Sequence, residues 1–427
     1  MAGSTDLRKR LLAEVMRIRA VDVHSHVPAA QPHARTLRDL LGYHYYTELA
    51  HSAGMPRDAL APERPDGQVI PEMVRALAAI DNTVQYGWLI ELARQLFGFP
   101  DRRLTEANWE GLARSVAAAA ERPGRAAEIM EQSNLERVFL TNEVDEDLSA
   151  IDGRLFVPSL RVDGLVLKLH EPEVRAALER GSGVAVGDAA GLHRALGAVM
   201  DRFRAAGARS VSMSLPPEFR MVESTPEGFE RALGAALRGE PGEAARERVL
   251  RSGMMRALSG LCRDFGFPFQ IMYGVERMAY PAGVPAGTDL PRAGDTLRGL
   301  LPLMNEFPGV TYCLSVLTDS QAQELAAYGW IVQNVVLSGH WWYLNVPAYM
   351  ARNLAGRLQC VPKTKLIGYY SDMYKLEFGL AKFDMYRRVL AGVLAADFVE
   401  AGLGTEEDAV RIAHLLLREN PKRIFSL

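Results

Sequence analysis

Residues 21–27 have the sequence VDVHSHV, and this short segment decides the fold prediction. Its three valines occupy odd positions, which is the period of a strand with one buried face. Asp22, His24 and His26 then share the opposite face. Two imidazole nitrogens about 2.0–2.1 Å from one point are good ligands for a divalent metal such as zinc. The pair predicts a metal site, although two histidines without a ligand explain this stretch alone equally well.

Strands and helices alternate along much of the remaining chain. Short apolar strand candidates are LERVFLT, RLFVPSLRV, ARSVSMSL, FPFQIMYGV, GVTYCLSV, WIVQNVVLSG and KLIGYY, and helical stretches such as GLHRALGAVMDRFRAAG separate several of them. This alternation predicts a parallel sheet, and eight such strands predict an α/β fold of the closed (β/α)8 TIM barrel type. An open doubly wound sheet is the alternative, but no glycine-rich turn follows the first strand.

We expect residues 1–427 to form a single barrel domain with a helical insertion at 37–132. The length of 427 residues is about three times that of a common domain, yet barrels often exceed about 250 residues as one domain. Two domains are an equally good interpretation of length alone. The insertion follows the first strand, because the pattern from Leu37 to Gln132 is mostly helical, with a break at GMPRDALAPERPDGQVIPEM.

The composition is that of a globular protein, with 48% hydrophobic and 24% charged residues. The formal charge is only −3, and no block of basic residues suits a run of phosphates, so we expect no nucleic-acid partner. We also expect no membrane association and a cytoplasmic location, because neither a signal peptide nor about 18 uninterrupted apolar residues are found. Cys262, Cys313 and Cys360 indicate neither a disulfide framework nor a cysteine zinc site.

The closing strand supplies a third candidate ligand, because KLIGYYSD reads as a buried strand ending at Asp372. This aspartate together with the histidine pair resembles the amidohydrolase superfamily, at VDVHSHV and YYSDMY. In that superfamily the aspartate ligates the metal or handles a proton. The resemblance implies these roles for Asp372, and a helix N-cap is the alternative.

The histidines that are missing point to one metal ion rather than two. Two-metal members of the superfamily usually carry further histidines on the fifth and sixth strands, but this chain has none between His193 and His340. The resemblance therefore implies a single divalent metal on His24, His26 and Asp372, with open positions for water or substrate. We expect Zn²⁺, with Mn²⁺ or Fe²⁺ as alternatives.

A closer resemblance, to the uronate isomerase branch of this superfamily, covers nearly the whole chain. The matching pieces occur in order and are GYHYYTEL, NTVQYGW, FVPSLRVD, SGHWWYLN and IGYYSDMYKLEFGLAKFDMYRRVL. This branch interconverts open-chain aldose and ketose sugar acids. The resemblance implies a small-molecule substrate and isomerase activity. Barrels of this type often form homo-oligomers, but no surface pattern in the sequence specifies one.

The residues of these pieces suit isomerisation. Moving a proton between C1 and C2 of an α-hydroxy aldehyde needs a base, an acid and a group that stabilises the enediolate. The candidates for proton transfer are His44, Tyr45 and Asp372. The planar donor fork of Arg161 suits a carboxylate. The full set of expected substrate-binding residues is Arg161, Arg277, Trp341, Trp342 and Tyr374.

Other interpretations remain open for several of these residues. His44 and Tyr45 could pack the insertion, and Arg161 could pair with Asp163. The loop that carries His340, Trp341 and Trp342 could be fixed to the barrel instead of covering a substrate. Asp22 could orient a metal ligand, or it could be a solvated or capping carboxylate.

Departures from the branch pattern bear on the substrate. Tyr374 stands where the branch has an arginine that helps to hold the substrate, and Lys375 is one place further on. Ser212-Met213-Ser214 replaces a Ser-Asp-His triplet, and Met272 replaces a histidine. These changes predict a ligand less anionic than a uronate, or one held differently.

We therefore expect a mononuclear metal-dependent isomerase of a hydroxylated small acid or sugar. A hydrolase or decarboxylase is the alternative, because a single metal can also activate water. A barrel that binds a ligand without catalysis is the third hypothesis.

Overall fold

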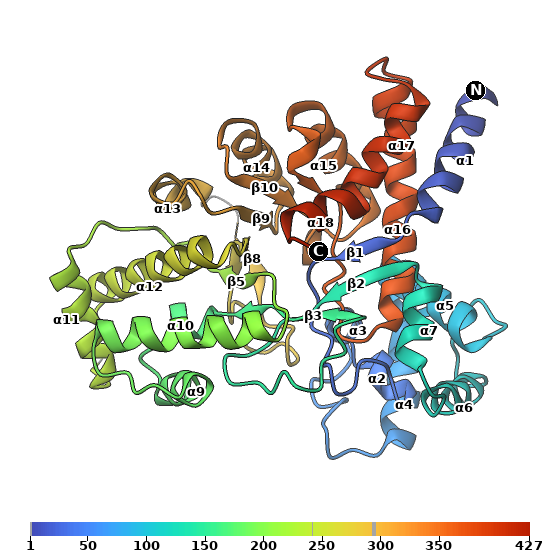
Figure 1. Ribbon diagram of the computed structural model, residues 1–427. Helices are drawn as coiled ribbons and strands as arrows, with labels where there is room; N and C mark the ends of the chain where they lie inside the picture. Colours follow the sequence, from blue (N-terminus) through green and yellow to red (C-terminus); the bar gives the residue numbers. More distant parts are fainter. Residues whose placement is uncertain (1, 241, 293–295) are drawn as a thin grey trace.

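The computed structural model describes residues 2–240, 242–292 and 296–427 (Figure 1). Its parallel strands form two hydrogen-bonded ladders, in the orders β1-β2-β3 and β11-β10-β9-β6-β5-β4. Their bounds are β1 Ala20–Asp22, β2 Leu135–Phe139, β3 Phe156–Val157, β4 Leu160–Arg161, β5 Val211–Leu215, β6 Phe269–Tyr273, β9 Tyr312–Val316, β10 Val335–Ser338 and β11 Leu366–Ile367. A small antiparallel hairpin pairs β7 (Val275–Glu276) with β8 (Leu290–Pro291).

The two ladders are continuous at β3 and β4, which are halves of one strand on either side of Pro158 and Ser159. A proline has no backbone N–H to donate, so the ladder is interrupted there. Hydrogen bonds resume at once, because the Asn142 amide donates to the Ser159 carbonyl and the Arg161 amide donates to the Asn142 carbonyl, both at 2.9 Å. The strand therefore joins β2 on one side to β5 on the other.

The other seam closes the barrel between the segments that follow β11 and β1. The Asp372 amide donates to the His24 carbonyl at 3.1 Å, and the His26 amide donates to the Met373 carbonyl at 2.8 Å. Within the described ranges, eight strand positions thus form a ring in chain order. The predicted (β/α)8 barrel is confirmed.

Both strands at this seam are shorter than the sequence predicts. The first was expected to include His24 and His26 but ends at Asp22, and the last was expected to reach Asp372 but ends at Ile367. Asp372 has a φ of 55°, in the left-handed region, so the chain turns out of the extended conformation at the residue where the two segments meet. The histidines lie on a paired but irregular segment beyond β1.

All residues between β1 and β2 are described, and helices are the only regular elements among them. They are α2 Leu37–Leu41, α3 His44–Ser52, α4 Asp66–Leu77, η1 Ala78–Ile80, α5 Val84–Phe97, α6 Trp109–Ala120 and α7 Arg125–Gln132. The expected break at 54–73 is shorter than predicted, because its second half belongs to α4. Figure 1 shows these helices gathered beside the mouth of the barrel, with α5 against α16.

The remaining helices surround the barrel. They are α8 Asp163–Leu167, α9 Pro172–Ser182, α10 Ala189–Ala205, α11 Pro226–Leu237, α12 Ala244–Phe265, η2 Leu297–Leu300, α13 Leu301–Glu306, α14 Asp319–Ile331, η3 Trp342–Leu344, α15 Pro347–Cys360, η4 Lys363–Lys365 and α16 Glu377–Val393. Residues 140–155, all of them described, connect β2 to β3 without a helix. None of the described helices is both long and apolar enough to span a bilayer.

The two ends of the chain cover α16 together. The N-terminal helix α1 (Ala2–Arg17) packs against α16 and α17, as Figure 1 shows at the right of the molecule. The C-terminal elements are η5 Leu394–Val399, α17 Glu406–His414, η6 Leu415–Glu419 and α18 Asn420–Ile424. A capping box opens α17, with the side chains of Thr405 and Asp408 bonded to each other's backbone amides.

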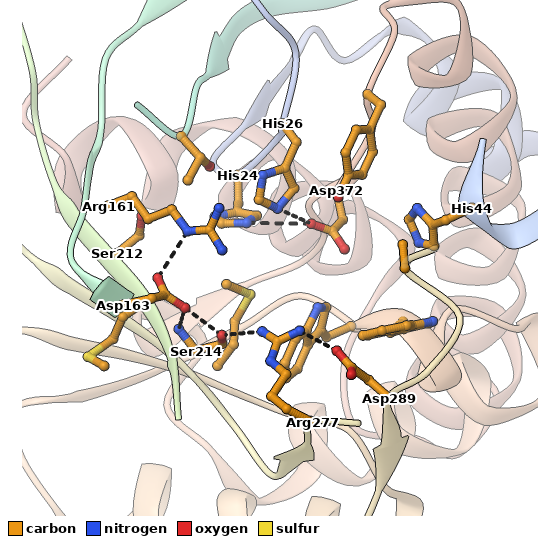
Figure 2. Close-up of a pocket in the computed structure, with 17 residues that line it drawn as sticks. His24, His26, His44, Arg161, Asp163, Ser212, Ser214, Arg277, Asp289 and Asp372 are labelled. Atoms are coloured by element: carbon orange, nitrogen blue, oxygen red, sulfur yellow. Dashed lines mark hydrogen bonds and ion pairs between the residues drawn. The ribbon is translucent and has the colours of Figure 1, made fainter. Parts of the chain in front are cut away.

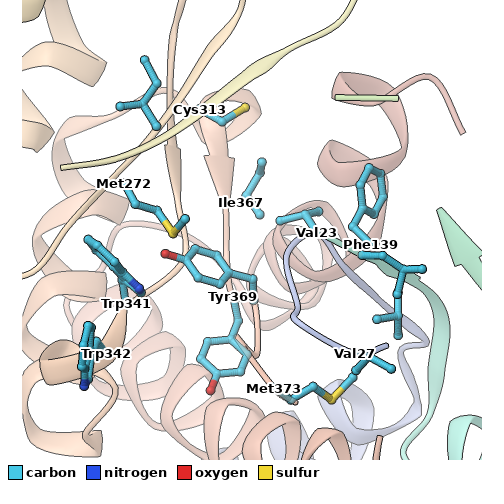
Figure 3. Close-up of a cluster of buried hydrophobic side chains, with 14 of the residues drawn as sticks. Val23, Val27, Phe139, Met272, Cys313, Trp341, Trp342, Ile367, Tyr369 and Met373 are labelled. Atoms are coloured by element: carbon cyan, nitrogen blue, oxygen red, sulfur yellow. The ribbon is translucent and has the colours of Figure 1, made fainter. Parts of the chain in front are cut away.

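Apolar side chains from several strands fill the barrel below its mouth. Figure 3 shows Val23, Phe139, Met272, Cys313 and Ile367 in this cluster. Each of them is buried, and burial raises the pKa of the Cys313 thiol well above its ordinary value. The candidate metal ligands therefore lie above a layer of buried apolar side chains.

Glu377, the first residue of α16, anchors this helix to the segment that follows the histidine pair. Its carboxylate accepts a hydrogen bond from the Ala34 amide at 3.1 Å, and the side chain is fully buried. Burial raises the pKa of Glu377 to about 7, although backbone amides act to lower it. A carboxyl group whose pKa is raised by folding stabilises the fold when it is protonated, and this contribution is lost as the pH rises through the folded-state pKa.

We predict that Glu377→Gln removes part of the pH dependence of stability. Parent and variant should unfold with similar free energies at about pH 5. At about pH 8 the variant should be the more stable, by on the order of 2 kcal/mol, because it buries no charge there. Urea unfolding at both pH values measures this difference. A difference that does not change with pH would contradict the assignment.

Candidate active site at the barrel mouth

A pocket opens where the carboxyl ends of the strands meet, which is where barrel enzymes place their active sites (Figure 2). Its lining comes from the ends of most of the strands and from the β7–β8 hairpin. The residues are His24, His26, His44, Thr141, Arg161, Asp163, Ser212, Met213, Ser214, Met272, Arg277, Ala286, Asp289, Trp341, Trp342, Asp372 and Tyr374. Every predicted site residue except Tyr45 lies in this lining.

His24, His26 and Asp372 converge on one point of the pocket. The Asp372 Oδ1 atom lies 3.4 Å from the His24 Nε2 atom and 3.3 Å from the His26 Nε2 atom. One ligand atom from each of the three residues lies within 4.8 Å of the others. Among the described residues, the buried His24 Nε2 and Asp372 Oδ1 atoms have no hydrogen-bond partner of acceptable geometry.

These atoms fit a divalent metal ion. Two ligands about 2.1 Å from one ion at a tetrahedral angle are about 3.4 Å apart, close to both separations seen here. Buried polar atoms without hydrogen bonds are costly, and coordination would satisfy them. Burial raises the pKa of the Asp372 carboxyl, but the two imidazoles beside it hold this pKa well below its usual value. A carboxylate and two imidazoles suit zinc, manganese or iron alike.

Asp22 lies behind the ligand cluster and stabilises the seam. Its carboxylate is fully buried and accepts hydrogen bonds from the Ser371 amide, at 2.9 Å, and from the Ser371 hydroxyl. Burial raises the pKa of Asp22 to about 6, although these bonds lower it. Asp22 is therefore neither solvated nor a helix cap, and its side-chain bonds position Ser371, the residue before Asp372. Asp372 does not cap a helix either, since Leu376 precedes α16.

His44 and Tyr45 are neighbours in sequence with different environments. His44 opens α3 and lines the pocket, with its ring 5.3 Å from that of Tyr374. Burial lowers the pKa of His44 to about 3, so its imidazole is neutral at physiological pH. Tyr45 is buried outside the pocket lining and packs against Trp88 and the ammonium of Lys382. The surroundings of Tyr45 therefore agree with packing of the insertion. Those of His44 agree with a role in the pocket.

A chain of charged and polar groups forms the wall opposite the ligand cluster (Figure 2). The Arg161 Nε atom lies 3.2 Å from Asp163, whose other oxygen accepts a hydrogen bond from the Ser214 hydroxyl at 2.6 Å. Arg277 donates to the same hydroxyl at 2.7 Å and to Asp289 at 2.5 Å. Each arginine is thus paired with a carboxylate, and this wall is close to charge balance.

Aromatic rings line the remaining side of the pocket. Trp341 and Trp342 are both buried, and the Trp342 indole donates to Glu48 of α3 at 3.4 Å. Tyr374 stacks on His26 with ring centroids 5.1 Å apart. Trp342 is therefore fixed to the insertion, and both tryptophans line the pocket. His340, the neighbour of Trp341, is buried outside the pocket lining.

Several pocket residues have no recognisable sequence signal. Asp289 reaches the site from the β7–β8 hairpin, which lies in a long irregular connection after β6, and Thr141 follows β2 in a loop. For Asp163 the sequence suggests only a pairing with Arg161. Such residues are brought together by loop geometry, which the periodicity of a sequence does not specify.

The chain is similar to uronate isomerases over its whole length. No family model matches it. The uronate isomerase of Phenylobacterium zucineum is 27% identical, across all of this chain and 95% of the relative. That of Xanthomonas campestris pv. campestris strain B100 is 25% identical, across 99% and 96% of the two chains.

The fold is shared with solved uronate isomerase structures. The enzyme of Thermotoga maritima superimposes with a TM-score of 0.90 at 18% identity, across 98% of this chain and 97% of that one. The glucuronate isomerase of Caulobacter crescentus also gives 0.90, at 20% identity, across 99% and 94%. The resemblance read from the sequence motifs is thus confirmed, and the chain is a divergent relative of the uronate isomerases.

Proposed function

We propose that this protein is a metal-dependent aldose–ketose isomerase of a hydroxylated small acid or sugar. The observation that carries the proposal is the convergence of His24, His26 and Asp372, two of whose facing atoms lack hydrogen bonds, in a pocket that also presents a neutral histidine. Whole-chain similarity to enzymes named uronate isomerases supports the reaction class.

The three converging residues would hold the metal. A bound divalent ion supplies positive charge that polarises a carbonyl and stabilises negative charge on neighbouring substrate oxygens. Both imidazoles contact the Oδ1 atom of Asp372, which leaves Oδ2 as the oxygen for proton transfer. Asp372 would take the proton from C2 of the open-chain aldose and return it to C1, while the proton of the C2 hydroxyl passes to the C1 oxygen. The neutral His44 would hydrogen-bond the substrate oxygen whose charge changes.

The pocket wall favours a substrate with little negative charge. Arg161 and Arg277 are already paired with Asp163 and Asp289, and Tyr374 adds no charge, because burial raises the pKa of its phenol to about 12. A substrate carboxylate would have to compete for either arginine. We therefore propose a monocarboxylate or a neutral sugar bound mainly through its hydroxyl groups, rather than a polyanion.

Metal analysis tests the first element of this proposal. Purified parent protein should carry about one equivalent of a divalent ion, with zinc the first expectation. His24→Ala and Asp372→Asn should lower the metal content severalfold, because each removes one of three protein ligands. His193→Ala, which changes a histidine of α10 outside the pocket, is the matched control. Equal metal content in all four proteins would contradict the centre.

Isotope labelling tests the reaction. Incubation of the metal-loaded enzyme in D₂O with hexuronates and with the corresponding neutral hexoses should place deuterium on carbon in the product, as seen by NMR. Incorporation of oxygen from labelled water with bond cleavage would instead support hydrolysis. Asp372→Asn should lower the rate by about 10²-fold or more.

The two neighbouring aromatic residues give a finer comparison. His44→Asn should lower kcat much more than Tyr45→Phe does, because only His44 lines the pocket. A larger loss in Tyr45→Phe would contradict the role proposed for His44.

A further inference from the structure

The backbone of residues 371–373, which carries the ligand Asp372, is held by hydrogen bonds on every polar group. Four of these six bonds come from the two segments at the barrel seam. The Ser371 amide donates to Asp22, the Asp372 amide to the His24 carbonyl and the Met373 amide to the Ser371 hydroxyl, while the Met373 carbonyl accepts from His26. The two remaining groups are the carbonyls of Ser371 and Asp372.

Those two carbonyls are held by side chains from elsewhere in the fold. The Lys382 Nζ atom, from α16, donates to the Ser371 carbonyl at 2.5 Å. The Tyr43 hydroxyl, from the residue that precedes α3, donates to the Asp372 carbonyl at 3.0 Å. Lys382 also donates to this hydroxyl at 2.8 Å, so the two side chains form one connected pair.

Burial of this pair in the interior is unfavourable in free energy. Lys382 is fully buried and Tyr43 nearly so. The ammonium lies over the rings of Tyr43, Tyr45 and Trp88, at 5.1, 4.7 and 4.8 Å from their centroids. An isolated charge in such a place is unfavourable, and the aromatic faces offset only part of that cost.

The held carbonyls flank a strained residue. Asp372 has a φ of 55°, a conformation that L-residues rarely adopt and that persists only where the surroundings enforce it. This conformation directs the Asp372 carboxylate toward His24 and His26. A small rotation of the peptide would move its Oδ1 atom away from both imidazoles.

We propose that Lys382 and Tyr43 are positioning residues that hold Asp372 in its metal-binding conformation. This inference rests on the proposed metal site, because it assigns to the pair an effect on the ligand geometry and not on the reaction itself. Groups behind metal ligands commonly change metal affinity by about 10–100-fold when they are removed.

The chain offers a matched control for each member of the pair. Tyr46, also fully buried on α3, has a hydroxyl without a partner among the described residues. Arg387, a second buried cation of α16, donates to the carbonyls of Ile18, Ser133 and Asn134, which precede β1 and β2 at the opposite end of the barrel. Tyr46→Phe and Arg387→Met thus repeat the chemical changes away from Asp372.

The test uses the full-length protein loaded with Co²⁺, whose visible absorption reports ligand geometry. Tyr43→Phe and Lys382→Met should bind Co²⁺ about tenfold more weakly or worse, in competition with a chelator, and should change its absorption spectrum. Tyr46→Phe and Arg387→Met should keep the affinity and spectrum of the parent. Circular dichroism checks that each variant is folded, and Tyr43→Phe decides the matter if Lys382→Met does not fold.

The outcomes separate this inference from the proposed function. Parent-like Co²⁺ affinity and spectrum in folded Tyr43→Phe would overturn the positioning role and leave the metal site intact. Equal weakening in the control variants would also overturn it, since the effect would then be general destabilisation. A parent protein that binds no Co²⁺ would overturn the metal site itself, and the inference with it.

Discussion

The seam between the first and last strands is the constraint on which the rest of this structure depends. The same backbone hydrogen bonds that close the barrel, from Asp372 to His24 and from His26 to Met373, set the distance between the imidazoles and the carboxylate. The contacts that close the barrel thus also bring the candidate metal ligands together. A chain that failed to close at this point would lose the ligand cluster, even if each residue were present.

Residues far apart in sequence stabilise the seam. The Asp22 carboxylate accepts a hydrogen bond from the Ser371 amide, and the Glu377 carboxylate connects α16 to Ala34, in the segment that follows the histidines. The helical insertion contributes Tyr43 and His44 at one turn, the first against the backbone of Asp372 and the second in the pocket. The insertion therefore contributes residues to the site and also lies beside the barrel mouth.

Much of this arrangement could be predicted from sequence, because alternation and spacing are local signals. The alternation of eight strands with helices predicted the barrel, and the family resemblance at VDVHSHV and YYSDMY implied that His24, His26 and Asp372 meet at its mouth. The strand ends could not be predicted, because the irregular pairing beyond Asp22 and Ile367 is set by tertiary contacts across the seam. Lys382 and Asp289 were missed for a related reason: a lysine in a helix and an aspartate in a loop have no pattern that reveals burial or a distant partner. Tyr45 matched a family motif, yet its side chain faces the core, since a motif does not fix which side of a helix meets the pocket.

The chain of groups from Arg161 through Asp163, Ser214 and Arg277 to Asp289 has a consequence for access to the site. It connects the barrel wall to the β7–β8 hairpin at the pocket edge. A ligand that recruits Arg277 competes with Asp289 for this arginine. The bond between Arg277 and Asp289 joins the two sides of the hairpin, because Arg277 follows β7 and Asp289 precedes β8. Ligand binding in the pocket and the conformation of the β7–β8 hairpin are then thermodynamically linked. Each shifts the equilibrium of the other by the same free energy.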